Sequence, residues 1–76
     1  MLELGDTQVT DAGIAHLREL RELRALSLSG TQVTDGALAH VSALRSLEVL
    51  DLTGTQVTDE GVEGLHQALP NCRIER

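Results

Sequence analysis

The chain has 76 residues, one cysteine and no Phe, Tyr or Trp, and these features limit how it can fold and what it can bind. The single cysteine, Cys72, excludes an internal disulfide, and a core without aromatic residues must be built from Leu, Val, Ile and Ala. The net charge of -6, from 12 acidic and six basic residues, disfavours nucleic acid and anionic membrane surfaces, because both bind through a basic footprint.

The first predicted element is a partial strand in residues 1–6, where Leu2 and Leu4 flank Glu3. The next segment, Thr7-Gln8-Val9-Thr10-Asp11, recurs identically at 31–35 and 55–59, a spacing of 24 residues each time. A fixed period of this length indicates stacked structural repeats. We therefore expect one domain, residues 1–76, which comprises the partial strand 1–6, two repeats at 7–30 and 31–54, and a terminal repeat at 55–76.

Each 24-residue unit is predicted to combine one short strand with one helix. Ile14, Leu17 and Leu20 step by three, as residues on one face of an α- or 3₁₀-helix do. Leu26 and Leu28 then alternate with a polar residue, which is typical of a strand. The next unit repeats both patterns in the same register, with Leu38, Val41, Leu44, Leu50 and Leu52.

The last predicted element is a closing strand around Ile74, in register with Leu26 and Leu50 but preceded by Pro70, which breaks the leucine spacing. The opening strand has no polar cap, although stacked repeats need caps at their ends. We therefore expect the chain to be the C-terminal part of a longer array. We also expect self-association through the N-terminal strand, whose backbone and apolar face would otherwise meet water.

The pattern Leu23-x-x-Leu26-x-Leu28-x-x-Thr31-x-Val33, repeated from Leu47 to Val57, resembles the leucine-rich repeat, with Thr where the common consensus has Asn or Cys. The Val-Thr-Asp-x-Gly stretch further resembles the 24-residue bacterial repeats of planctomycete arrays and, more distantly, F-box-associated repeats. This resemblance implies an α/β fold, namely a short right-handed solenoid with parallel strands on the concave face and helices on the convex face. The family is defined by its scaffold, so the resemblance implies neither a reaction nor a cofactor.

Two sets of polar residues recur at fixed positions and are predicted to be structural. The hydroxyls of one set are expected to stack and to bond loop backbone groups. The carboxylates of the other set, which follow a threonine before each helix, are expected to accept helix N-terminal N–H groups as caps rather than to act in catalysis. These are the ladder threonines Thr7, Thr31 and Thr55, and the cap aspartates Asp11, Asp35 and Asp59.

Small residues also recur. Asp6, Gly30 and Gly54 share a position directly after the strand, where a left-handed or tightly turned backbone is expected. The small residues at positions 13, 37 and 61 indicate a close approach of each helix to the sheet.

Side chains that flank the inward leucines are predicted to form the concave face, where most partners of the family bind. This face lacks the Trp and Tyr of usual binding hot spots and has Arg73 at one end, which favours a generic solvated surface. If the face does bind, its acidic residues select a basic segment. The predicted face comprises Met1, Glu3, Gly5, Ala25, Ser27, Ser29, Val49, Asp51, Thr53, Arg73 and Glu75.

Three further features have simpler explanations than a chemical site. His16 and His40 lie one repeat apart without a third ligand, so solvent-facing helix residues are favoured over a zinc site. Cys72 is expected to be a small buried residue rather than a nucleophile. The charges of residues 18–22 indicate a solvated helix end with local ion pairing.

We conclude from the sequence that the chain is a non-catalytic protein-interaction scaffold that needs no cofactor and no metal. The alternative is a purely structural cap or a self-assembling repeat fragment without a ligand. No stretch reaches the ~20 apolar residues of a membrane span, and no signal peptide is recognisable, so a cytoplasmic location is the default expectation.

Overall fold

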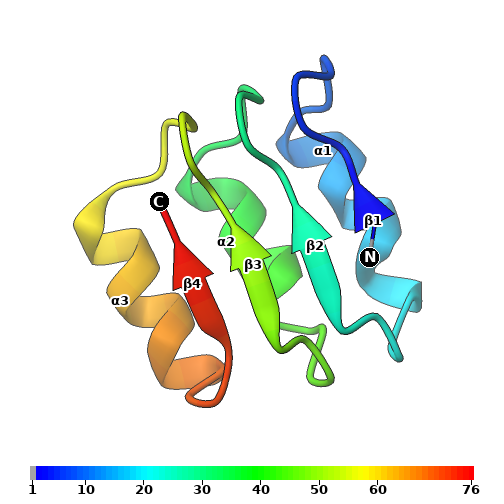
Figure 1. Cartoon of the computed structure of the whole chain (residues 1–76), viewed down its shortest axis with the longest axis vertical. Coiled ribbons are helices and arrows are strands. Elements are labelled where there is room, and N and C mark those ends of the chain that lie inside the picture. Colours follow the sequence, from blue (N-terminus) through cyan, green and yellow to red (C-terminus); the bar gives the residue numbers. More distant parts are fainter. Residues whose placement is uncertain (1) are drawn as a thin grey trace.

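The computed structural model describes residues 2–76 and shows an α/β repeat in which one open sheet packs against one layer of helices (Figure 1). The strands are parallel and lie in chain order, and each connection passes through the helical layer. In chain order the elements are β1 (Leu2–Glu3), α1 (Asp11–Ile14), the 3₁₀-helix η1 (Ala15–Glu19), β2 (Ala25–Ser27), α2 (Asp35–Val41), β3 (Val49–Asp51), α3 (Asp59–Ala68) and β4 (Arg73–Glu75).

The predicted 24-residue register is confirmed by the strand pairing. Leu26 of β2 pairs with Leu2 of β1 on one side and with Leu50 of β3 on the other. Leu50 in turn pairs with Ile74 of β4, so the closing strand also keeps the register despite Pro70. Leu2, Leu26, Leu50 and Ile74 therefore form one apolar row that faces the helices.

The core lies between the sheet and the helices and is aliphatic. Leu26, Leu28, Leu50 and Leu52 are almost completely buried and supply its sheet side. Helix α2 supplies most of the other side, because three of its seven residues are buried. The remaining buried apolar residues come from the helices and loops on either side and are Ile14, Val33, Leu44, Leu47, Val57, Leu65, Leu69 and Cys72.

The turn after each strand has the predicted left-handed backbone. Gly30 and Gly54 have φ angles of 69° and 75°, and Asp6 has 59°. Glycine adopts this region without strain, and aspartate tolerates it better than most residues with a side chain.

Of the small residues at positions 13, 37 and 61, the two glycines approach a different neighbour from the one predicted, while Ala37 is completely buried in the core. A Cβ on Gly61 would collide with the carboxylate of Asp35 in the preceding repeat, and a Cβ on Gly13 would lie 2.9 Å from the Val9 side chain. The close approach is therefore between a helix start and the loop or repeat before it, and not between helix and sheet.

The first repeat departs from the pattern of the second. Its α-helix has four residues before it continues as η1, whereas α2 has seven. Leu20, which was expected on the buried helix face, is 44% exposed, while its equivalent Leu44 is completely buried. Leu44 has a repeat on both sides, but within this chain Leu20 has one on a single side only.

This contrast gives a matched pair of substitutions. Leu44→Ala removes a buried side chain and should lower the free energy of unfolding by about 2–5 kcal/mol. Leu20→Ala should lower it by about 1 kcal/mol or less, because much of that side chain already lies in water. Urea unfolding followed by circular dichroism would measure both values. Equal losses would contradict the assignment of Leu44 to the core and of Leu20 to the surface.

Candidate interaction surface

The sheet surface that faces away from the helices is the candidate interaction surface, and it faces the viewer in Figure 1. We use "sheet face" for Glu3, Ala25, Ser27, Ser29, Val49, Asp51, Thr53, Arg73 and Glu75. All lie on the strands or directly after them. Gly5 was also expected there and lies beside Ser29, and Met1 falls outside the described residues.

Strand pairing places the sheet-face residues in two rows. One row contains Ala25, Val49 and Arg73 in register. The other contains Glu3, Ser27, Asp51 and Glu75, so three of its four members are carboxylates. Neighbouring strands lie about 4.8 Å apart, so residues of a row two strands apart are separated by about 10 Å. The fold thus gathers charges that are far apart in the sequence into one acidic row.

Within this row, two hydrogen bonds from Thr53 favour the charged form of Asp51. The hydroxyl of Thr53 donates a hydrogen bond of 2.6 Å to Asp51 Oδ1, and the Thr53 N–H donates another of 3.0 Å. These two bonds lower the pKa of Asp51 below its ordinary value of 3.8. Glu75 differs, because Arg73 lies 3.3 Å from it in an exposed ion pair. At neutral pH Asp51 therefore presents an anion that no cation within residues 2–76 pairs with.

The ladder threonines each stabilise their own loop. The hydroxyls of Thr7, Thr31 and Thr55 donate to the carbonyl oxygen three residues earlier, each at 2.7 Å. Thr31 does so from a buried position. Each hydroxyl thus closes the turn that follows a strand, and three equivalent bonds recur every 24 residues.

Two of the three aspartates expected to cap helices, Asp11 and Asp35, bond to the following repeat, and the third, Asp59, accepts a hydrogen bond from Arg76. Asp11 accepts the backbone N–H of Thr34 at 2.8 Å and its hydroxyl at 2.5 Å. Asp35 accepts the same two groups of Thr58 at the same distances. The threonine then acts as the helix N-cap, since Thr34 accepts from Gly36 N–H and Thr58 from Gly61 N–H. A helix cap bonds to N–H groups two or three residues away, whereas the partner of each of these aspartates lies 23 residues further along the chain.

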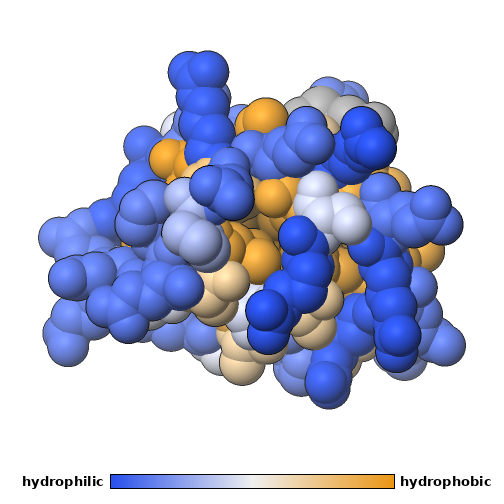
Figure 2. Space-filling view, turned by 90° about the horizontal axis from the view of Figure 1, so that it is seen from below, coloured by the Kyte–Doolittle hydropathy of each residue, from blue (hydrophilic) through white to orange (hydrophobic). Residues whose placement is uncertain are grey.

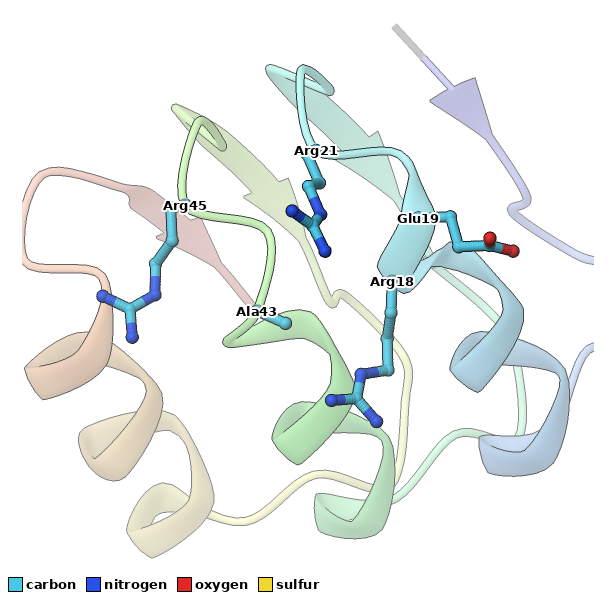
Figure 3. Close-up of a pocket in the computed structure, with 5 residues that line it drawn as sticks. All are labelled: Arg18, Glu19, Arg21, Ala43 and Arg45. Atoms are coloured by element: carbon cyan, nitrogen blue, oxygen red, sulfur yellow. The ribbon is translucent and has the colours of Figure 1, made fainter.

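A second feature, which the sequence analysis missed, is a hollow of about 520 Å³ with three arginines at its rim (Figure 3). Arg18 comes from η1, and Arg21 and Arg45 come from equivalent turns one repeat apart. Glu19 also lines the hollow, but its carboxylate points away from the guanidinium groups of Arg18 and Arg21 (Figure 3). Figure 2 shows this edge of the molecule, where hydrophilic side chains surround apolar surface in the middle of the view.

The ion pairing predicted for residues 18–22 does not form. Across residues 2–76 the ion pairs are Arg73–Glu75 and Arg76–Asp59, so the three arginines of the hollow keep their donors for water or an anion. Their planar donor groups match the geometry of carboxylates. Three of the six arginines thus line one hollow of an acidic molecule, whereas the acidic row of the sheet face contains none.

The residues considered for metal binding and nucleophilic chemistry come from different segments of the chain. His16 lies in η1 and His40 in α2. Within the described part of the chain, no three His, Cys, Asp or Glu side chains are grouped as a metal site requires. Cys72 is buried, and burial raises the pKa of its thiol, which disfavours the reactive thiolate. In residues 2–76 no helix is both long enough and apolar enough for a bilayer.

Comparison with known proteins identifies one part of the chain. A family model described as Leucine Rich repeat matches residues 43–65, which include β3 and the first part of α3. No curated protein matches the chain. Residues 43–65 are therefore similar to a leucine-rich repeat, a type of unit that generally mediates protein–protein contacts and is typically non-enzymatic.

The bonds between Asp35 and Thr58 predict a specific acid sensitivity. The Thr58 hydroxyl and N–H lower the pKa of Asp35 below 3.8 in the folded state. Its stabilising effect is therefore complete above the ordinary carboxyl pKa and is lost as the pH falls below 3.8 through the folded pKa. Thermal unfolding between neutral pH and this acid range should show Asp35→Asn losing less stability on acidification than the parent. Glu63→Gln, on the exposed surface of α3, is the control and should behave as the parent does.

Proposed function

We propose that the chain is a non-catalytic protein-interaction scaffold whose sheet face binds a basic segment of a partner protein. The observation that carries the proposal is the acidic row of Glu3, Ser27, Asp51 and Glu75 across all four strands. The similarity of residues 43–65 to a leucine-rich repeat supports the same class of function.

The spacing of the acidic row suggests how the partner lies. In a polyproline II peptide, residues three apart point to the same side and are separated by about 9 Å, which is close to two strand spacings. A basic residue near Glu3 and another three positions on would therefore reach Asp51. The two side chains between them point to other sides of the peptide, and Ser27, a small residue, leaves room for the peptide backbone. The surface has no large apolar anchor, so attraction between charges supplies specificity and fast encounter more than affinity.

We further propose that the repeats belong to the 24-residue bacterial type and divide as 1–6, 7–30, 31–54 and 55–76. In this proposal they form one end, the C-terminal end, of a longer right-handed solenoid. Support comes from the outer side of the first repeat, where apolar residues are partly exposed although their equivalents in the second repeat are buried. These pairs are Val9 and Val33, Leu17 and Val41, Leu20 and Leu44, and Leu23 and Leu47.

The second candidate function is a structural cap or a self-assembling fragment without a ligand. The same open side of the first repeat favours it. We call this side the amino-side face and define it as Leu2, Leu4, Val9, Leu17, Leu20 and Leu23. Strand β1 also lies at the edge of the sheet, where its outer backbone groups are available to another strand.

Binding of a basic peptide tests the first function. An extended peptide with arginines three residues apart, added to the isotope-labelled chain, should shift amide resonances of β2, β3 and β4. Asp51→Lys should weaken binding on the order of tenfold, because it removes one attraction and adds one repulsion. Glu63→Lys makes the same charge change on α3, away from the sheet face, and should have a much smaller effect. If both variants weakened peptide binding equally, the attraction would be non-specific, and this result would contradict the proposal.

Self-association tests the second function. The parent chain should form pairs as its concentration rises, and Leu20→Glu should shift it towards the monomer by placing a charge in the amino-side face. Light scattering after size exclusion would measure the mass of each. A parent that stays monomeric and folded over the whole concentration range would count against association through this face.

A further inference from the structure

The second repeat is fastened to the third by two acceptor positions near the start of its helix. Asp35 accepts the N–H and the hydroxyl of Thr58, at 2.8 and 2.5 Å. The carbonyl oxygen of Val33 accepts the N–H of Gln56, at 3.1 Å. The second repeat thus offers a carboxylate and a carbonyl, and the third repeat supplies the donors to both.

The third repeat offers the same two acceptors, and one side chain occupies both of them. Asp59 and Val57 stand 24 residues after Asp35 and Val33. The Arg76 guanidinium donates through Nη1 to the Asp59 carboxylate and through Nη2 to the Val57 carbonyl oxygen, the latter at 3.2 Å. A planar guanidinium presents several N–H donors in a fixed fork, so it can replace donors that a following repeat would bring from two backbone positions.

We propose that Arg76 closes the exposed side of the third repeat and so prevents the amino-side face of a second copy of the chain from stacking on it. We call the closed side the carboxyl-side face and define it as Val57, Asp59, Val62, Cys72, Ile74 and Arg76. The proposal rests on the repeat-stacking part of the proposed function and is independent of what the sheet face binds.

The carboxyl-side face otherwise suits such a neighbour. Val62, Cys72 and Ile74 line a hollow of about 480 Å³, and Asp59 and Arg76 lie at its rim. Val62 and Ile74 are partly buried apolar residues packed against the core, so the hollow has an apolar floor that a further repeat would cover. The exposed Asp59 carboxylate is available to a new donor once Arg76 leaves it.

The matching donors flank Val9 of the amino-side face. Thr10 and Gln8 precede Thr58 and Gln56 by two repeats and hold the equivalent positions. Over residues 2–76, no hydrogen bond is found for the N–H of Gln8, the N–H of Thr10 or the Thr10 hydroxyl. Leucines of the same face lie beside them, half-buried or, for Leu20, 44% exposed. A second copy can therefore present Thr10 to Asp59 and Gln8 to Val57, repeating the contacts found inside the chain.

The direction of stacking follows from this pairing. With Arg76 in place, association through amino-side faces ends with a pair of copies, because each copy uses the same face. Without Arg76, the amino-side face of one copy meets the carboxyl-side face of the next, and such a head-to-tail contact leaves a further face open at each end.

The test is Arg76→Ala, studied by sedimentation equilibrium over a wide concentration range. We expect species larger than a pair, and about tenfold tighter association than the parent shows. Arg45→Ala is the matched control, because it removes the same charge from an exposed turn of the second repeat outside both faces, and its mass distribution should match the parent's. Adding Thr10→Ala to Arg76→Ala should reverse part of the association, since it removes the hydroxyl that replaces the guanidinium.

Circular dichroism would establish that every variant is folded. A folded Arg76→Ala with the parent's mass at all concentrations would overturn the proposal. An equal rise in Arg45→Ala would also overturn it, because loss of a positive charge alone would then explain the association. Peptide binding to the sheet face, measured on the same variants, reports separately on the proposed function, because neither Arg76 nor Thr10 belongs to the acidic row.

Discussion

The direct pairing of residues 24 apart on neighbouring parallel strands is the constraint on which the rest of the structure depends. Leu2, Leu26, Leu50 and Ile74 form one such row, and the helices close over it. Side chains alternate between the two sides of a strand, so a slip of one residue would turn the apolar row towards water and the acidic row towards the helices. The identical period of the loops keeps this register, and a core without aromatic residues depends on it for close packing.

The helical layer lacks such a backbone ladder, and side chains take its place. Asp11 and Asp35 reach across to Thr34 and Thr58, and each threonine then caps its own helix. One carboxylate thus fixes the start of the next helix by satisfying a backbone N–H and by orienting the capping hydroxyl. This coupling explains why glycine stands at position 61, where any side chain would meet the Asp35 carboxylate.

The sequence predicted the elements that depend on periodicity and missed those that depend on neighbours. Strand register, the left-handed turns and the buried leucines of the second repeat follow from a repeated pattern, because equivalent residues there have equivalent surroundings. Leu20 and Leu44 occupy the same position, yet only Leu44 is enclosed by repeats on both sides. The partner of Asp11 could have been found from the constant separation between each aspartate and the threonine 23 residues later. Arg76 has no equivalent in another repeat, so no comparison within the chain could reveal its contacts.

The repeats differ in how many neighbouring repeats they contact, and this difference affects how firmly each residue of the sheet face is held. The stability of stacked repeats is approximately a sum of intrinsic terms and contacts between neighbours, so the unit with neighbours on both sides is the most firmly held. In this chain that unit carries Leu44, Leu50 and Leu52, all fully or almost fully buried. Strand β3 follows its helix and has a partner strand on each side. Asp51 lies on β3, whereas Glu3 and Glu75 lie on the two edge strands. The carboxylate whose pKa is lowered by Thr53 therefore also stands on the best-supported strand, which makes it the fixed point against which a partner's basic residues would be positioned.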